Sequence, residues 1–238
     1  MPPQVRDASV MFSVDLLIPT ARFVFSVAGD HVEVSPEHRS PEAFIEYGRW
    51  RRERSVTGMT TFPNSLLVRG ASSFLVDPGL ELQNAPVVRA LEQRGLSVGD
   101  LDFVALTHAH ADHAAALVDL LLPVVVHERE TSMPHWQVVE GILARHELKL
   151  LCGDGGELVP GVRWARTPGH TPGSVSYAID TPEGVVVACG DLLGPSRQPF
   201  DEMAQWGPDA AELLRSWELI RAWRPARIIA GHLPPFAP

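Results

Sequence analysis

The chain has 238 residues, with 20 basic and 29 acidic side chains and a formal net charge of −9. That length suits a single α/β domain, residues 1–238, with a substantial core. The acidic balance opposes a broad phosphate-binding surface, so nucleic acid is not an expected partner. Two cysteines, Cys152 and Cys189, are too few for a disulfide framework. They predict reduced, mostly buried thiols in a cytoplasmic protein.

The first apolar stretch, Met11 to Val27, is broken by Asp15 and Arg22, which argues against a signal peptide. Its partial alternation predicts two strands instead. The longest apolar run, Leu120 to Val126, is interrupted by Pro123 and is far too short to cross a bilayer. We therefore expect no membrane segment.

A local basic cluster follows a helix that we expect to start near Ser40, and it comprises Arg49, Arg51, Arg52 and Arg54. A solvated helix face and a phosphate-binding patch are both open interpretations of this cluster. Beyond it, Leu66 to Val76 resembles a hairpin, and Ala85 to Arg94 a helix that Gly95 closes.

Four metal-ligand side chains crowd into the stretch Thr107 to His113, whose sequence is THAHADH. The apolar run Phe103 to Leu106 before it is typical of a buried strand, and Ala114 to Leu117 after it favours a helix. In an extended segment, side chains two apart point the same way, so His108 and His110 can bind one ion. Asp112 and His113 then turn toward a second position as the helix begins.

The remaining segments continue the alternation of strands and helices. We expect strands at Val124 to His127, Val162 to Ala165, Val175 to Ile179, Val185 to Ala188 and Ile228 to Ala230, and helices at Trp136 to His146 and Asp209 to Trp223. Three further candidate ligands follow or meet apolar runs: His170 in a TPGHTPG turn, Asp191 and His232. Together the seven residues could hold two ions that share one carboxylate.

These ordered motifs closely resemble those of the metallo-β-lactamase-fold hydrolases: HxHxDH, then a lone His, a lone Asp and a last His. The resemblance runs from about Thr61 to His232 and includes the segment Phe74 to Gly79, FLVDPG, which looks like the first motif of this superfamily. It implies a four-layer αββα sandwich of two mixed β-sheets flanked by helices. Pattern alone indicates only an α/β protein.

Carried over residue by residue, the resemblance implies two metal positions and one shared ligand. His108, His110 and His170 would bind the first ion, Asp112, His113 and His232 the second, and Asp191 would bridge them. Asp77 would hold the loop and orient ligands by hydrogen bonding. A turn residue before Pro78 and Gly79 is the alternative interpretation of Asp77.

The expected cofactors are two divalent ions, with zinc preferred and manganese or iron as alternatives. The expected chemistry is that of a dinuclear hydrolase in which a metal-bridging hydroxide attacks a carboxylic ester, lactone or thioester. Asp112, or a water, is the candidate to deliver a proton to the leaving group. A metal-dependent phosphodiesterase is the alternative enzyme, and a metal-stabilised binding module is the non-catalytic alternative.

Departures from particular subfamilies narrow the resemblance to the glyoxalase II and lactonase-like branch. True β-lactamases of the best-known class have Cys where Asp191 stands, and diiron flavoproteins have Glu where His110 stands. Typical glyoxalase II enzymes append a helical domain, whereas six residues follow His232. Quorum-signal lactonases usually have Tyr three residues after the bridging Asp, where this chain has Gly194.

The loops expected to shape a pocket are residues 31–60, 130–136 and 192–208. They contain the large apolar side chains Trp50, Met59, Met133, Trp136, Phe200, Met203 and Trp206. Such a lining favours a small-molecule acyl substrate, although these residues could equally cover the core or a homodimer interface. The other histidines, His31, His38, His127, His135 and His146, are expected to be ordinary surface or core residues.

Overall fold

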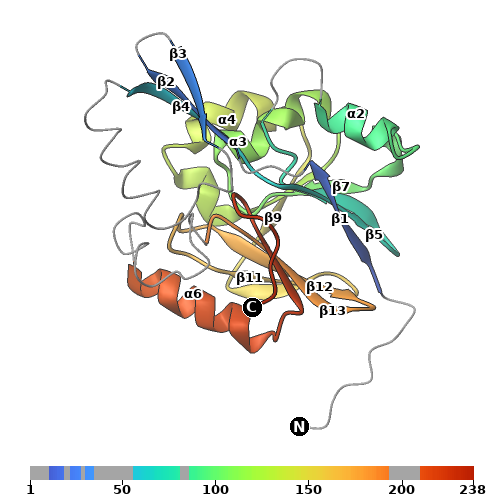
Figure 1. Ribbon diagram of the computed structural model, residues 1–238. Helices are drawn as coiled ribbons and strands as arrows, with labels where there is room; N and C mark the ends of the chain where they lie inside the picture. Colours follow the sequence, from blue (N-terminus) through green and yellow to red (C-terminus); the bar gives the residue numbers. More distant parts are fainter. Residues whose placement is uncertain (1–10, 19–21, 28–29, 35–55, 81–85, 193–209) are drawn as a thin grey trace, which may run out of the picture.

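The computed structural model describes residues 11–18, 22–27, 30–34, 56–80, 86–192 and 210–238. Two β-sheets lie face to face, with α2, α3 and α4 on the outside of one and α6 on the outside of the other (Figure 1). The order of layers is helix, sheet, sheet, helix. This arrangement confirms the predicted αββα sandwich.

The first sheet is mixed and has the strand order β1-β5-β6-β7-β8-β9. Its strands are β1 (Ser13–Ile18), β5 (Ser65–Arg69), β6 (Ser73–Val76), β7 (Phe103–Ala105), β8 (Val124–His127) and β9 (Leu148–Leu151). The first three pair in antiparallel fashion, and β6 to β9 run parallel. The carboxyl ends of β6, β7 and β8 therefore meet at one edge.

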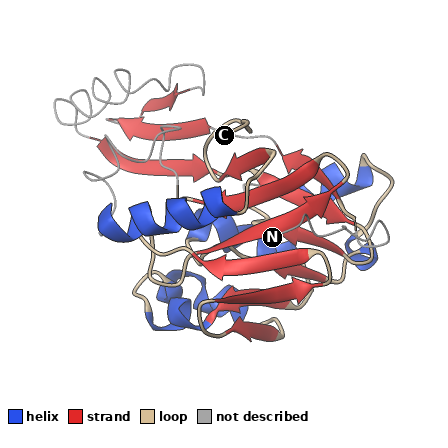
Figure 2. Ribbon diagram, turned by 90° about the horizontal axis from the view of Figure 1, so that it is seen from below, coloured by secondary structure: helices blue, strands red, loops and turns tan. Residues whose placement is uncertain are grey.

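The second sheet has the order β10-β11-β12-β13-β14, in which only β13 and β14 are parallel. Figure 2 shows the strands in the centre of the molecule and the helices at its periphery. Its strands are β10 (Gly155–Val159), β11 (Val162–Arg166), β12 (Val175–Thr181), β13 (Gly184–Gly190) and β14 (Arg227–Ala230). A smaller sheet pairs β2 (Arg22–Val27) with β3 (Asp30–Val34) and β4 (Val56–Phe62).

The helices among the described residues are short except for the last. They are α2 (Pro86–Glu92), α3 (Ala111–Ala114), α4 (Trp136–Leu143) and α6 (Ala210–Ala222), with 3₁₀ turns η3 (Val98–Asp100), η4 (Ala115–Asp119) and η5 (Glu128–Ser132). The segment after the THAHADH motif is therefore a single α-turn followed by 3₁₀ backbone, where a continuous helix was expected. No helix in the described part of the chain is long and apolar enough to span a membrane.

Strand alternation divides the core into layers. On β7, Phe103 and Ala105 pack between the two sheets, whereas Val104 packs against the helices of the first sheet. On β13, Ala188 faces the other sheet and Val187 packs under α6. Because successive side chains of a strand point to opposite faces, these continuous apolar runs are what a sheet covered on both sides requires.

Most of the predicted elements are confirmed, including the two N-terminal strands, the β5–β6 hairpin and helix α2 ahead of Gly95. Strands β3, β4, β9 and β10 were not predicted, and β3 and β4 occupy the two ends of the segment 31–60 that was expected to be a loop. The expectation of buried thiols is wrong for Cys152, which is exposed, and holds for Cys189. The expected helix near Ser40 and the four arginines at 49–54 lie outside the described residues.

Candidate metal centre

Each candidate ligand stands just beyond the end of a core strand. His108 to His113 follow β7, and Asp191 and His232 directly follow β13 and β14. His170 lies on the turn between β11 and β12. The parallel pairing of β13 with β14, and of β6 with β7, brings these ends to one edge of the sandwich. Four ligands come from the first sheet and three from the second.

The first group of ligand atoms consists of three imidazole nitrogens. His110 Nδ1 lies 3.0 Å from His108 Nε2 and 2.9 Å from His170 Nε2. The hydroxyl of Thr107 donates to Asp77, so it accepts from Nδ1 of His108 at 3.1 Å. That contact leaves the lone pair of His108 on Nε2, facing the other two rings.

The second group consists of Asp112, His113 and His232, whose candidate ligand atoms all lie within 4.8 Å of one another. His232 Nε2 is 3.3 Å from Asp112 Oδ2, and His113 Nε2 is 3.9 Å from the same oxygen. His113 donates from Nδ1 to Asp77 Oδ2 at 2.9 Å, so Nε2 is the ring nitrogen that faces the group.

Asp191 lies between the two groups. Its Oδ2 is 3.6 Å from His170 Nε2 in the first group and 3.3 Å from His232 Nε2 in the second. Its Oδ1 is 3.3 Å from His113 Nε2. One carboxylate therefore faces ligand atoms of both groups, which is the geometry expected of a bridge.

Asp77 holds the ligand loop in place by hydrogen bonds. It is buried, it accepts from the backbone N–H of Thr107 at 2.7 Å, and its φ is 48°. A positive φ is uncommon outside glycine, although Asp and Asn adopt it more readily than most residues. The hydrogen bonds to Thr107 and His113 favour the orienting role over that of a simple turn residue.

The donor set fits divalent cations. His113 Nε2 and Asp191 Oδ1 are buried and face each other at 3.3 Å without a hydrogen bond between them. Nitrogen and oxygen ligands placed 2.0–2.1 Å from a tetrahedral zinc lie about 3.3 Å apart. The spacing and the mix of imidazole and carboxylate are therefore those of a metal site.

The two groups differ in their charge. Burial lowers the pKa of His110 to about 4 and also lowers the pKa values of His108 and His170, so these rings are neutral at pH 7. For His232, burial opposes the charged ring, but Asp191 and Asp112 outweigh it and raise its pKa to about 9. Neighbouring carboxylates raise the pKa of His113 in the same way.

The carboxylates respond in the opposite direction. Burial would raise the pKa of Asp112, but His113 and His232 outweigh it and lower that pKa to about 2. The same two imidazoles hold the pKa of Asp191 well below its usual range, against the effect of burial. Both carboxylates are therefore ionised at neutral pH.

A glycine is required where β14 ends. A Cβ on Gly231 would collide with Asp191 Oδ1 and lie 3.0 Å from His113 Cε1. A Cβ on Gly190, whose φ is 50°, would likewise collide with the side chain of Thr107. Both glycines let the backbone of the second sheet approach the ligands of the first.

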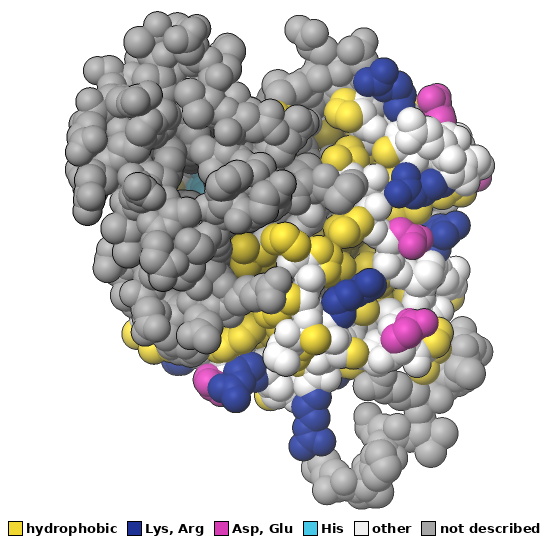
Figure 3. All heavy atoms as spheres, viewed as in Figure 1, with side chains coloured by type: hydrophobic (Ala, Val, Ile, Leu, Met, Phe, Trp, Pro, Cys, Tyr) yellow, Lys and Arg dark blue, Asp and Glu magenta, His cyan; other side chains and the backbone are white. Residues whose placement is uncertain are grey.

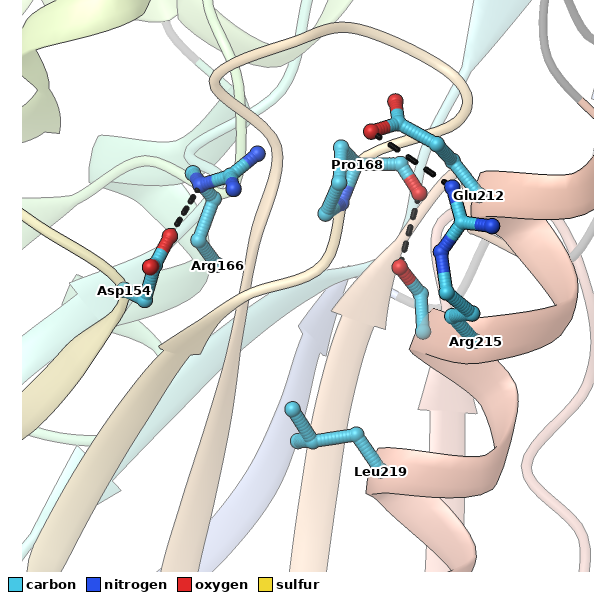
Figure 4. Close-up of a pocket in the computed structure, with 7 residues that line it drawn as sticks. Asp154, Arg166, Pro168, Glu212, Arg215 and Leu219 are labelled. Atoms are coloured by element: carbon cyan, nitrogen blue, oxygen red, sulfur yellow. Dashed lines mark hydrogen bonds and ion pairs between the residues drawn. The ribbon is translucent and has the colours of Figure 1, made fainter.

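The turn that bears His170 is anchored from its outer side. Ser216 on α6 is buried and donates to the carbonyl of Pro168 at 2.7 Å (Figure 4). The pocket drawn there is lined in part by Arg166, paired with Asp154 at 2.7 Å, and by Arg215 on α6. It lies on the helix side of the turn, and none of the seven ligands lines it.

The structure brings together all seven predicted site residues. Of the residues expected to line a pocket, Trp136, the first residue of α4, instead packs in the core, and Met133 is half-buried. Trp50, Phe200, Met203, Trp206 and Gly194 lie outside the described residues, as does His38, and the side chains of His31 and Met59 are not described.

Sequence analysis missed Thr107, Glu130 and Thr171, which contact the ligand loops by hydrogen bonds. His135, expected to be an ordinary histidine, has its ring centroid 4.4 Å from that of His110. His127 and His146 are bound to backbone carbonyls as ordinary structural residues. Glu130 stands just beyond a buried parallel strand, a position that could have singled it out.

The fold and the site define a metal-binding protein of the αββα type. Residues 59–232 match the model of the Metallo-beta-lactamase superfamily, and the chain belongs to that superfamily. The match covers nearly the same residues as the resemblance seen in the motifs. It confirms the prediction of a hydrolase from this superfamily.

Curated relatives place the chain near two kinds of enzyme. It is 37% identical over 139 residues to a hydroxyacylglutathione hydrolase of Cupriavidus metallidurans, covering 52% of this chain and 46% of the relative. It is 29% identical over 155 residues to an N-acyl homoserine lactonase of Bacillus thuringiensis, covering 61% of each. The chain thus spans about half the length of the first relative. Both names agree with the glyoxalase II and lactonase-like branch.

Solved structures share the fold over nearly the whole chain. A metallo-beta-lactamase-like protein of Thermotoga maritima superposes with a TM-score of 0.69 at 18% identity, covering 96% of this chain and all of that one. An N-acyl homoserine lactone hydrolase with N-hexanoyl-L-homoserine at its catalytic metal centre gives a TM-score of 0.65 at 20% identity, covering 93% and 92%. At these identities the likeness concerns the fold.

Proposed function

We propose that this chain is a dinuclear metal-dependent hydrolase of carboxylic esters, lactones or thioesters. The observation that carries the proposal is the position of Asp191, whose two oxygens face ligand atoms of both groups at 3.3–3.6 Å. Two donor sets joined by one carboxylate are suited to two cations a few ångströms apart.

His108, His110 and His170 would hold one cation and Asp112, His113 and His232 the other. When bound, such ions activate a water as nucleophile at neutral pH and stabilise the charge that develops on the acyl oxygen. Zinc fits the imidazole-rich donor set, and manganese or iron would also fit it. The protein supplies the fixed geometry: buried rings held by Asp77 and Thr107, and a backbone kept close by Gly231.

Asp112 is the proposed proton carrier. Its carboxylate is ionised at neutral pH because its pKa is about 2, and its side chain is partly exposed, at 17%. The carboxylate oxygen of Asp112 that does not hold a cation can therefore accept the proton of the attacking water and then deliver it to the leaving alkoxide or thiolate. No serine or cysteine nucleophile is needed for this sequence of steps.

Hydrolysis of an acyl substrate is favoured over phosphodiester cleavage by two observations. Both enzyme-named relatives act, by their names, on acyl compounds. On the described part of the face in Figure 3, basic and acidic side chains are interspersed rather than gathered into a basic surface. A small-molecule acyl substrate remains our proposal, as do a cytoplasmic location and a homodimer.

The test is hydrolysis by the purified protein after its metal content has been measured. The panel contains a long-chain acyl lactone, a p-nitrophenyl ester, a glutathione thioester and bis-p-nitrophenyl phosphate, each with and without a chelator. We expect about two metals per chain and turnover of an acyl substrate that chelation abolishes. Preference for the phosphate would replace the proposal with a phosphodiesterase.

A variant at Asp112 distinguishes a catalyst from a binding module. Asp112→Asn keeps the shape of the side chain but removes its charge and its ability to carry the proton. A catalyst should lose activity by about 10²- to 10⁴-fold. Asp180→Asn is the matched control and should retain activity, because Asp180 lies at the end of β12 opposite His170 and pairs with Arg163. Equal activity of the two variants would contradict the assigned role.

A further inference from the structure

Besides Asp77, a second buried carboxylate at this edge is not among the candidate ligands. Glu130 lies on η5, just beyond the carboxyl end of β8, and its side chain is fully buried. β8 is the parallel neighbour of β7, which leads into the THAHADH motif. Glu130 therefore points into the same edge of the sheet as the metal ligands, from one strand further along.

Both oxygens of Glu130 are fully engaged. Oε2 accepts from the backbone N–H of Ala109 at 2.8 Å and from His135 Nε2 at 2.8 Å. Oε1 accepts from the hydroxyl of Thr171 at 2.6 Å and from the backbone N–H of Gly173 at 3.0 Å. A carboxylate has about four lone-pair positions, so all of them are used.

The four donors belong to the surroundings of one ligand group. Ala109 separates His108 from His110, and Thr171 follows His170 directly in the chain. A single carboxylate thus ties the loop after β7 to the turn between β11 and β12. These two segments come from different sheets, and together they supply all three imidazoles of the first group.

The turn between β11 and β12 leaves room for the carboxylate of Glu130. A Cβ on Gly173 would meet Glu130 Oε1, as well as its Cγ and its backbone nitrogen at 2.8 Å. Only a residue without a side chain lets the turn come this close. Thr171, which is buried, also pairs with Ser174 Oγ at 2.7 Å, so its hydroxyl is held in place for Glu130.

We propose that Glu130 is the positioning residue for the first metal group, setting the distance between the backbone segments that carry His110 and His170. The inference rests on the proposed metal-dependent function. Asp77 bonds directly to the ring of His113 and reaches His108 through Thr107. Glu130 acts instead through Ala109, Thr171 and Gly173, and so serves the two imidazoles that Asp77 does not contact.

The variant Glu130→Gln tests this role with little change in volume. Whichever way the amide is turned, its NH₂ group would face a backbone N–H, of either Ala109 or Gly173, which cannot become an acceptor. The two segments should then separate slightly. Substitution of a residue that orients metal ligands typically lowers metal affinity by about 10- to 100-fold, and we expect a loss of that size at the first group.

The measurement is zinc affinity by chelator competition, which requires no substrate. It is made in a His232→Ala background, which removes a ligand of the second group, so that zinc binding at the first group is measured alone. The measurement is repeated in a His170→Ala background for the second group. Glu130→Gln should weaken zinc binding in the first background and leave it within a few-fold in the second. Glu128→Gln, an exposed carboxylate on the same 3₁₀ turn, is the matched control and should change neither.

A milder variant covers the case in which Glu130→Gln does not fold. Thr171→Val removes one of the four hydrogen bonds while keeping the shape of the side chain, and should give a smaller loss at the first group alone. Equal losses at both groups, or unchanged zinc affinity in folded Glu130→Gln, would overturn the inference. Absence of hydrolysis with wild-type zinc affinity would count against the proposed function but not against this role of Glu130.

Discussion

The two ligand groups of the metal centre hold their histidines in different ways. In the first group, His108, His110 and His170 are surrounded by other imidazoles, and burial keeps their pKa values low. In the second group, His113 and His232 face carboxylates, which raise their pKa values. The histidines of the first group are thus neutral and can bind a cation directly, whereas those of the second group carry a proton.

This difference shows that ligand identity alone does not define a metal site. A neutral imidazole offers its lone pair at once, whereas a protonated one must first release its proton. The carboxylates that attract a second cation are the same groups that stabilise the competing protons. Each prediction below tests the contrast between the groups, beginning with the residue that they share.

Replacing Asp191 should have the largest effect, because both groups lose their common carboxylate. We expect Asp191→Ala to lower acyl hydrolysis by on the order of 10³-fold and to bind fewer than two metals per chain. Metal content by elemental analysis and turnover of the best substrate would be measured together. Asp180→Ala is the control, and two metals bound to Asp191→Ala with wild-type affinity would contradict the shared role.

Metal affinity should depend on pH at the second group far more than at the first. His232 keeps its proton below its pKa of about 9, so a cation must displace it, and binding weakens as pH falls below that value. Each displaced proton changes affinity about tenfold per pH unit. His110, with a pKa of about 4, has no proton to lose near pH 7.

The measurement is zinc affinity between pH 6 and pH 8 in the two single-group backgrounds, His170→Ala and His232→Ala. The second group should gain about 10²-fold or more over this window, while the first should stay nearly constant. Equal slopes in the two backgrounds would show that the carboxylates do not separate the groups in this way.

Asp77→Asn should weaken the second group more than the first. Asn tolerates the positive φ of this position, so the backbone is preserved, but the charge that orients His113 is lost. We expect a loss of zinc affinity of about 10- to 100-fold at the second group. Chelator competition in the same two backgrounds would measure the zinc affinity of each group. A larger loss at the first group would contradict this prediction.

Ser216→Ala should produce the smallest effect, a loss of stability at the turn that bears His170. It removes the hydrogen bond to Pro168, which anchors the turn bearing His170. Loss of this buried contact should cost about 1–3 kcal/mol of the free energy of unfolding. Denaturant melts of the metal-free protein would measure it. Arg215→Ala, one position earlier and exposed, should change stability by less than about 0.5 kcal/mol.

Local signals in the sequence located most of the central strands and the positions of the candidate ligands, whereas the order of layers followed from the resemblance to the superfamily and not from the pattern. Buried parallel strands read as continuous apolar runs, and His108, Asp191 and His232 lie beyond such runs. Which nitrogen of each ring faces the site could not be predicted. It depends on contacts such as that between Thr107 and His108, which arise only when distant strands meet.

Two of the strands that were missed lack those signals. β9 (Leu148–Leu151) and β10 (Gly155–Val159) are edge strands, and most of their residues are exposed or half-buried. Edge strands do not need the apolar runs of central ones. Glu130 was missed for a different reason, since three of its four donors, on Ala109, Thr171 and Gly173, lie more than twenty residues away in the chain.

The division of the ligands between the two sheets has a mechanical consequence. Four side chains come from the loop after β7 in one sheet, and three from the ends of strands in the other. Any cation bound through both sets is a cross-link between the halves of the sandwich, so each bound ion resists their separation. At a free metal concentration a hundredfold above Kd, such an ion adds about 2.7 kcal/mol to the free energy of unfolding. Chelation should therefore lower the melting temperature as well as the activity.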